Sequence, residues 1–221
     1  MVTIFSEIGQ MILVTLPDYE MGTRYVSVWA KKMIDGIKNK RRRIIELSRK
    51  KVTKKNIESY LAKQPIKLVL FNGHGDRDCI LGQDGEILVK VRVNEGILKS
   101  KIIHVLACSC AAELGPAAVL SGALAFVGYK KPFAFSHWGK SRNPLKDSRA
   151  RPFFESANKA AYMLIKGYTV KKAMEKSQDA FGREMDRLVS SEATNDDLLD
   201  ASLLFWDRQN QVCLGKSEVK I

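Results

Sequence analysis

The sequence predicts an α/β protein with an open, mostly parallel sheet and helices on both faces, forming a three-layer sandwich that ends in further helices and a hairpin. Three observations predict it. Short, continuous apolar runs bounded by polar or glycine residues recur along the chain, as expected for strands buried on both faces. Segments with helical periodicity lie between these runs, and only one early connection has the signature of a hairpin. Strands and helices that alternate in this way form a sheet with right-handed crossovers.

The strands of this sheet are predicted at residues 11–16, 66–71, 102–107 and 123–129, with a further short strand at 44–47. The helices between them are predicted at residues 25–37, 53–62 and 112–120. In the first helix, Val26, Trp29, Met33 and Ile37 recur at the spacing of one helical face. Thr53 stands where the second helix needs an N-cap.

The early hairpin spans residues 80–89 and turns at Asp84-Gly85, a strong tight-turn signal. After a basic loop at 139–152, two helices are predicted at residues 153–165 and 169–189, separated by Gly167 in a C-cap position. A final hairpin is predicted to pair residues 203–206 with 211–214. Because no linker interrupts the pattern, we expect a single domain over residues 1–221.

The composition is that of a globular protein whose core needs no disulfide or metal to hold it together. Of 221 residues, 45% are hydrophobic and 28% are charged. The longest apolar stretch, residues 117–129, is too short to span a bilayer, and the N-terminus lacks the pattern of a secretory signal. Four cysteines at irregular spacing favour reduced thiols over a disulfide framework. We therefore expect a cytoplasmic protein with no membrane contact.

The formal net charge of +13 favours acidic partners. The segment from Lys31 to Lys55 contains twelve basic residues and only two acidic ones, Asp35 and Glu46. A solvated basic helix and loop is one interpretation, and contact with an acidic protein or a nucleic acid is the other. No aromatic residue after Trp29 interleaves this run as a base-stacking surface would require.

Two strands end in residues that can carry chemistry. The strand at 66–71 is followed by His74 between two glycines, and the strand at 102–107 is followed by Cys108. Ligands of open parallel sheets bind beyond the carboxyl ends of the strands. Cys108 is expected near a helix N-terminus, which would lower its thiol pKa. The pair supplies a thiol nucleophile and a proton-transfer partner.

Other residues compete for these roles. Cys108 could be an inert core thiol, and Cys110 is a rival nucleophile. His104 lies inside a strand and is expected to be structural, whereas His137 follows a later apolar segment and could approach the cleft. A metal site built from His104, Cys108 and Cys110 fits no common zinc spacing, so we expect neither a metal nor another cofactor.

Over roughly residues 11–215, the chain resembles the caspase-like cysteine peptidase clan, which includes caspases, separases, gingipains, legumains and CHAT-type proteases. The resemblance rests on the segments LVLFNGHG (68–75), HVLAC (104–108) and GALAFVGY (122–129), while LIKGYTV (164–170) is similar to small CHAT-type proteins in particular. Motifs ending in His-Gly and Ala-Cys, in this order on successive buried strands, are more specific than either alone.

The resemblance implies peptide-bond hydrolysis by a cysteine–histidine dyad. Cys108 would attack the scissile carbonyl and His74 would protonate the leaving amine, while the backbone N–H groups of Gly75 and Cys108 would stabilise the oxyanion. Position 106 is leucine, so the acidic residue that metacaspases carry two places before the nucleophile is missing. Asp147 lies much where separase-like members place an acidic pocket residue, and Asp76 is a second candidate. The expected cleavage is after Arg or Lys; alternatively, Asp147 merely offsets nearby cations on a solvated loop.

Two other classes of function stay open. The chain could be a catalytically idle caspase-like scaffold or sensor module, although it retains both His74 and Cys108. It could also be a basic nucleic-acid-binding α/β domain, whose affinity would fall steeply with salt and which would not need the thiol.

Overall fold

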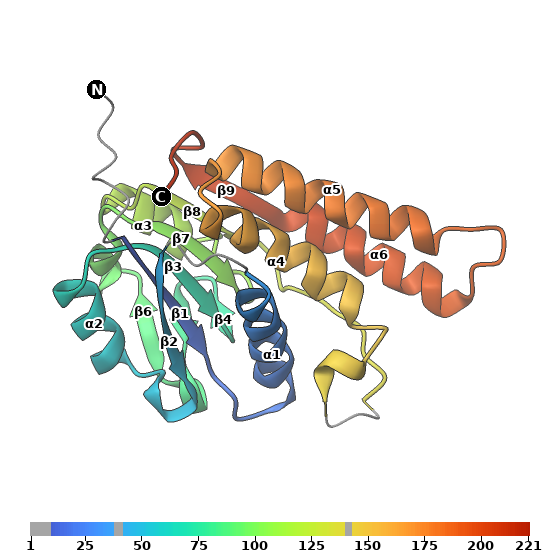
Figure 1. The fold of residues 1–221 in the computed structure, drawn as a ribbon, viewed down its shortest axis with the longest axis horizontal. Helices are drawn as coiled ribbons and strands as arrows, with labels where there is room; N and C mark the ends of the chain where they lie inside the picture. The colour runs from blue at the N-terminus through green and yellow to red at the C-terminus, as the bar shows by residue number, and fades with distance from the viewer. Residues whose placement is uncertain (1–9, 38–41, 140–142) are drawn as a thin grey trace.

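The computed structural model describes residues 10–37, 42–139 and 143–221, and its larger sheet has six strands (Figure 1). Their order is β2-β1-β3-β7-β8-β9, and every neighbouring pair is parallel except β8 and β9. The strands are β1 (Met11–Leu16), β2 (Arg43–Ser48), β3 (Ile66–Asn72), β7 (Ile102–Leu106), β8 (Ala125–Tyr129) and β9 (Gln211–Gly215). The predicted open, mostly parallel sheet is confirmed.

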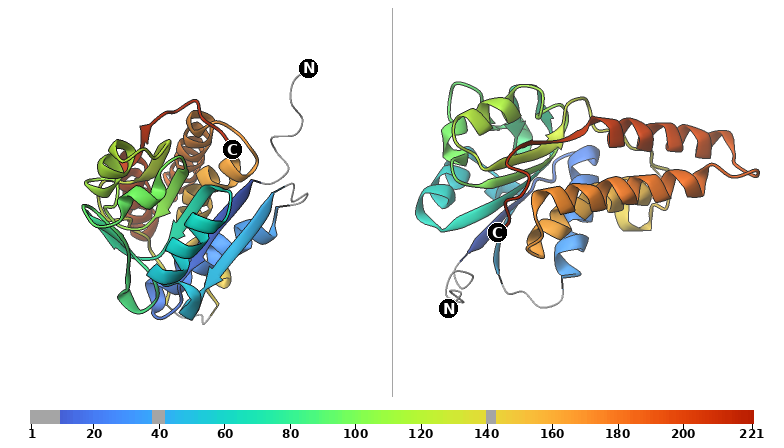
Figure 2. Two further views of the ribbon diagram at one scale, coloured as in Figure 1. Left: turned by 90° about the vertical axis from the view of Figure 1, so that its left-hand side faces the viewer. Right: turned by 90° about the horizontal axis from the view of Figure 1, so that it is seen from above.

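Helices cover both faces of this sheet (Figures 1 and 2). The α-helices of the described residues are α1 (Met21–Asp35), α2 (Lys54–Lys63), α3 (Leu114–Leu120), α4 (Arg151–Ile165), α5 (Val170–Leu188) and α6 (Asn195–Asn210). On β1, Leu13 packs in the cluster that contains α2 and α3, while Ile12 and Val14 pack in the cluster that contains α1, α4 and α5. Because both sides of the strands are buried, their sequences are continuous apolar runs.

The predicted early hairpin is confirmed as part of a small antiparallel sheet. This sheet consists of β4 (Gly75–Asp76), β5 (Cys79–Leu81) and β6 (Ile87–Lys90), with Ile80 opposite Val89. The turn between β5 and β6 places Asp84 and Gly85 at positive φ angles of 54° and 79°, which is why an Asp-Gly pair is suited to it.

Side-chain caps fix where several helices begin. Thr53 caps α2 as predicted, by accepting a hydrogen bond from the N–H of Asn56. Glu20 and Thr23 form a capping box that starts α1 earlier than the apolar pattern alone indicates. At the end of α4, Gly167 adopts φ +86°, the left-handed conformation that closes a helix.

Of the predicted final hairpin, the second strand is confirmed and the first is wrong. Residues 211–214 form the strand β9, but residues 203–206 belong to α6. Thr194 and Asp197 form a capping box that starts this helix, and Ala201, Leu204 and Asp207 are buried at helical spacing. The polar residues that resemble a turn are therefore the last turn of α6. Helices α5 and α6 lie side by side and project beyond the sheet (Figure 2).

The described part of the basic region lies around the edge strand β2, and several of its cations already have partners. Lys31 pairs with both Asp35 and Glu46, and Arg49 pairs with Asp18. Residues 38–41 of this region lie outside the described residues, and an acidic or nucleic-acid partner stays a prediction. No helix in the described ranges is long and apolar enough to cross a membrane.

Candidate active site

His74 and Cys108 follow two strands that lie next to each other in the sheet. In the parallel pairing of β3 and β7, Asn72 is aligned with Leu106, and each chain reaches its candidate residue two positions later. The pairing continues past the strand ends, because the N–H of Gly73 donates to the carbonyl oxygen of Leu106 at 3.2 Å. Both residues therefore lie just beyond the same edge of the sheet, at matching positions in the register of β3 and β7.

The two glycines beside His74 allow the turn to approach its neighbours closely. Gly73 has φ +137°, and a Cβ atom there would lie 2.9 Å from Pro17 Cγ. A Cβ atom on Gly75 would lie 2.2 Å from the sulfur of Cys110 and 3.1 Å from the carbonyl oxygen of Cys108. The segment that carries His74 is thus in direct contact with the loop that carries Cys108.

The imidazole of His74 has a carboxylate partner that the sequence analysis missed. Its Nε2 forms a short hydrogen bond with Glu20 Oε1, and the ring of Tyr19 lies edge-on at a centroid distance of 6.2 Å. A carboxylate on one ring nitrogen fixes the orientation of an imidazole. The signal that could have identified Glu20 is its place just after β1, which is next to β3 and ends at the same edge.

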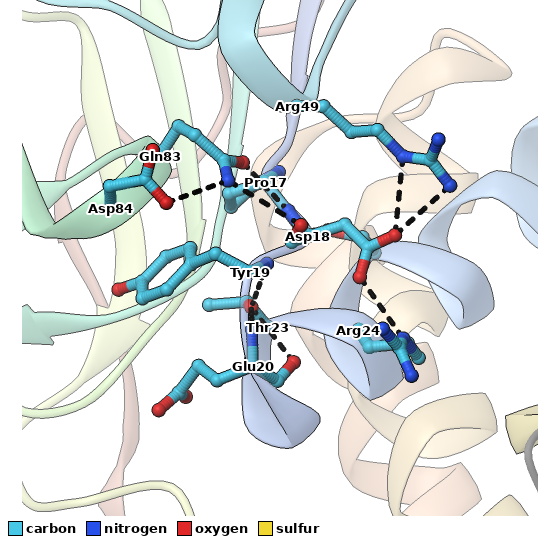
Figure 3. A network of polar contacts seen from close by, with 10 residues as sticks. Pro17, Asp18, Tyr19, Glu20, Thr23, Arg24, Arg49, Gln83 and Asp84 are labelled. Atoms are coloured by element: carbon cyan, nitrogen blue, oxygen red, sulfur yellow. Dashed lines mark hydrogen bonds and ion pairs between the residues drawn. The ribbon is translucent and has the colours of Figure 1, made fainter.

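The loop that holds Glu20 is tied to the rest of the edge by a polar network (Figure 3). The carboxylate of Asp18 pairs with Arg24 at 3.1 Å and with Arg49 at 3.2 Å. The side-chain oxygen of Gln83 accepts a hydrogen bond from the N–H of Asp18 at 3.0 Å. Glu20 lies two residues after Asp18 and is the N-cap residue of α1. This anchoring places the carboxylate of Glu20 on a fixed turn.

Cys108 is half-buried, and its thiol donates to the carbonyl oxygen of Phe133 at 3.9 Å. Burial raises its pKa, and the nearby carboxyl groups of Asp207 and Asp76 add to the increase. The expectation of a thiol activated by a helix N-terminus is wrong, because α3 begins only at Leu114. The resting form of Cys108 is therefore the thiol, and a base must remove its proton.

The rival thiol of Cys110 is enclosed. It is fully buried and donates to the carbonyl oxygens of Cys79 and Cys108, each at 3.3 Å. Burial raises its pKa far above the ordinary value. Of the two cysteines, Cys108 is the one that is partly exposed.

The other two histidines are packed among hydrophobic groups. His104 is buried in β7, where burial lowers its pKa to about 4. His137 is half-buried, with ring centroids 5.5 Å from Tyr25 and 5.8 Å from Phe135. Among the described residues, no three His, Cys, Asp or Glu side chains come together as metal ligands.

Asp147 lies in the interior, only 2% exposed, so the alternative of a solvated loop residue is wrong. One carboxylate oxygen accepts hydrogen bonds from the Tyr25 hydroxyl at 2.7 Å and the Trp138 N–H at 3.0 Å. The other accepts from the N–H groups of Arg149 and Ala150. Burial alone would raise the pKa of Asp147, but these four donors lower it. Asp147 is a buried anion whose acceptor positions are filled by its own chain.

Two further acidic residues lie near Cys108. Asp76 is exposed on β4 and accepts the N–H of Arg77 at 2.7 Å. Asp207 is completely buried on α6, and one of its oxygens accepts the N–H of Ala134 at 2.9 Å. The sequence analysis placed Asp207 in a turn and gave it no role.

An extended segment runs past Cys108 on its way from β8 toward α4. It includes Phe133, whose carbonyl accepts the thiol, and continues through Phe135, Ser136 and His137. The backbone groups of these last three residues form no hydrogen bond with any described residue. An extended chain with free N–H and C=O groups can pair with a second extended chain, as a sheet edge does.

Comparison with known proteins finds a likeness in structure only. No family model and no curated protein sequence matches the chain. A solved structure described as "Structure of Protease" is similar, with a TM-score of 0.57 and 14% sequence identity over 95% of this chain and 48% of that chain. This chain thus spans about half the length of that protein. At this identity the likeness shows a shared fold.

Proposed function

We propose that this protein is a cysteine peptidase of the caspase-like kind, with Cys108 as the nucleophile and His74 as the general base and acid. The observation that carries the proposal is the register of β3 and β7, which brings His74 and Cys108 to adjacent points on one edge of the sheet. The fold shared with a protease supports it. Glu20 is added to the dyad as the residue that orients the imidazole.

In this proposal the proton of the thiol moves first. His74 takes it as Cys108 attacks the substrate carbonyl, and the carboxylate of Glu20 stabilises the imidazolium that forms. The imidazolium then donates the proton to the leaving amine, which departs as the acyl-enzyme forms. His74 next removes a proton from a water molecule that attacks the thioester, and returns it to the sulfur as the acid product leaves.

The oxyanion would be held by the backbone N–H groups of Gly75 and Cys108. The N–H of Cys108 forms no hydrogen bond with any described residue, so it is free to donate. Removing one donor of this kind costs about 3–4 kcal/mol of transition-state stabilisation. The substrate would bind as an extended chain along Phe135, Ser136 and His137.

For the residue before the cleaved bond we propose Arg or Lys. Asp147 would contribute a fixed negative charge at the Trp138 end of this extended segment, because its four donors are neutral and leave the charge of the carboxylate uncompensated. Asp76, exposed beside Gly75, is the second candidate for contact with a basic side chain. The exposed carboxylate of Asp76 could pair directly with a guanidinium, whereas Asp147, whose acceptor positions are filled, would act through its charge alone.

The test is labelling by a peptide that ends in a thiol-reactive group, read by intact mass, together with cleavage of fluorogenic peptides. Labelling should persist in Cys110→Ala and disappear in Cys108→Ala, and cleavage should fall at least 100-fold in His74→Gln. Peptides ending in arginine should be cut and those ending in aspartate should not. A folded protein that neither labels nor cleaves would instead be an idle module.

A further inference from the structure

The last turns of α6 hold the chain segment that follows β8 at three points. Trp206 Nε1 donates to the carbonyl oxygen of Pro132, and Asp207 accepts the N–H of Ala134, both at 2.9 Å. The carbonyl oxygen of Asn210 accepts the N–H of Lys130, also at 2.9 Å. These contacts fall on alternate residues, so one side of the segment 130–134 is fixed to the helix.

The same segment contacts the loop of Cys108 through the residues between those points. The N–H of Ser109 donates to the carbonyl oxygen of Lys131 at 3.2 Å, and the Cys108 thiol donates to the carbonyl oxygen of Phe133. Segment 130–134 is therefore held between α6 and the candidate nucleophile. Any shift of its Phe133–Ala134 peptide would move the acceptor of the thiol.

Asp207 is the ionisable group among the three α6 contacts. It is 0% exposed, and its second carboxylate oxygen has no partner among the described residues. The titratable groups that face it are Cys108 on the loop after β7 and Tyr129 on β8. Burial raises the pKa of Tyr129 well above its usual value, so that phenol stays neutral. Nothing described on these elements offers Asp207 a cation.

Building on the proposed function, we propose that Asp207 is a positioning residue for Cys108, which acts by fixing the Phe133–Ala134 peptide against the thiol. Its carboxyl group holds the N–H of Ala134 and thereby sets the position of the Phe133 carbonyl.

The protonation state of Asp207 makes this role measurable. Burial raises its pKa to about 8, so the group is neutral at pH 7 and gains a charge beside Cys108 at higher pH. A negative charge near a thiol disfavours the thiolate. Ionisation of Asp207 should therefore delay the rise of Cys108 reactivity with pH.

The test compares Asp207→Asn, which keeps an acceptor for Ala134 but does not titrate, with Asp207→Leu, which has no acceptor. The control is Asp186→Asn, at an exposed position on α5. The rate of alkylation of Cys108 by iodoacetamide is followed from pH 6 to pH 10 by peptide mass spectrometry. Because alkylation needs no peptidase activity, failure of this proposal is distinguishable from failure of the proposed function.

In Asp207→Asn we expect alkylation of Cys108 at pH 9 to be threefold to tenfold faster than in the wild type, with peptide cleavage at pH 7 retained. In Asp207→Leu we expect kcat to fall at least tenfold with little change in KM. A profile in Asp207→Asn that matches the wild type and the control would overturn the proposal, even if Asp207→Leu does not fold. Unchanged kcat in a folded Asp207→Leu would overturn it as well.

Discussion

Asp147 and Asp207 are two buried aspartates at opposite ends of one extended segment, and they differ in charge. Asp147 holds one end by accepting the N–H of Trp138, and its carboxylate has four donors in all. Asp207 holds the Ala134 end and has one donor. The pKa of Asp147 is lowered, whereas that of Asp207 is raised to about 8. Burial is common to both, so the number of donors decides which one carries a charge at neutral pH.

The difference shows how one loop can be fixed by two distinct means. At Asp147 the chain surrounds an anion with backbone N–H groups and a phenol, which makes that end rigid and charged. At Asp207 a neutral carboxyl group makes a single bond next to the thiol. A permanent charge there would raise the pKa of Cys108 and oppose its activation.

The largest expected effect comes from Asp147→Asn. An amide cannot accept from all four donors and turns its own NH₂ toward some of them, which leaves buried donors unpaired. We expect the free energy of unfolding at pH 7 to fall by about 3 kcal/mol, measured by urea titration. The control Asp186→Asn should change it by less than 0.5 kcal/mol, roughly the limit for surface changes. A loss as small as the control's would show that the donors do not hold a charge at Asp147.

Asp207→Asn should stabilise the protein at high pH, by removing a loss of stability that the wild type suffers as pH rises. The folded pKa is raised above the unfolded value, so the native state keeps a proton that the unfolded state loses. Wild-type stability therefore declines as pH rises from about 4 to 8, and the variant lacks this decline. Between pH 5 and pH 8 the variant should gain on the order of 2–3 kcal/mol relative to the wild type. Parallel stability curves for the two proteins would contradict the raised pKa.

His104 tests the same rule on a buried base. Its pKa is lowered to about 4, chiefly by burial. Between pH 6.5 and 4, His104 binds a proton in the unfolded state but not in the native state. Wild-type stability is therefore lost as pH falls through this range. His104→Gln removes the titration and should reduce that loss by roughly 1–2 kcal/mol. Thermal unfolding at pH 4.5 and pH 7 measures it, and an equal acid loss in both proteins would count against a neutral His104.

The smallest expected effect is that of Tyr25→Phe. It removes one of the four donors of Asp147 and leaves three backbone N–H groups in place. We expect a loss of about 1 kcal/mol at pH 7. The loss should disappear in the Asp147→Asn background, which a double-mutant cycle of unfolding free energies would reveal. Additive losses would mean that the Tyr25 hydroxyl contributes to stability independently of the charge on Asp147.

Local pattern was enough to predict most of the sheet. Strands such as β1 and β7 are buried on both faces, and mostly apolar runs satisfy that environment. The order of the strands and the register of β3 and β7 could not be predicted in this way; the sequence indicated only that His74 and Cys108 each follow a buried strand. The strand predicted at 203–206 failed because its apolar residues fit either period, and the capping box at Thr194 decides for a helix.

The residues that sequence reasoning missed are those that act across long separations. Glu20 reaches His74 from another strand, and Asp207 reaches Ala134 from the last helix. Neither belongs to a motif around its target. The burial of Asp147 has the same origin, because Tyr25 comes from α1 and only the folded chain brings it to the loop.

The contact between Gly75 and the sulfur of Cys110 has a consequence for any mutational survey of this protein. Even a methyl group at position 75 would displace a core thiol, so every replacement there will score as damaging whether or not the protein hydrolyses anything. The role of the Gly75 N–H can be tested separately, by replacing its backbone amide with an ester through chemical ligation. That exchange removes the hydrogen and adds no bulk.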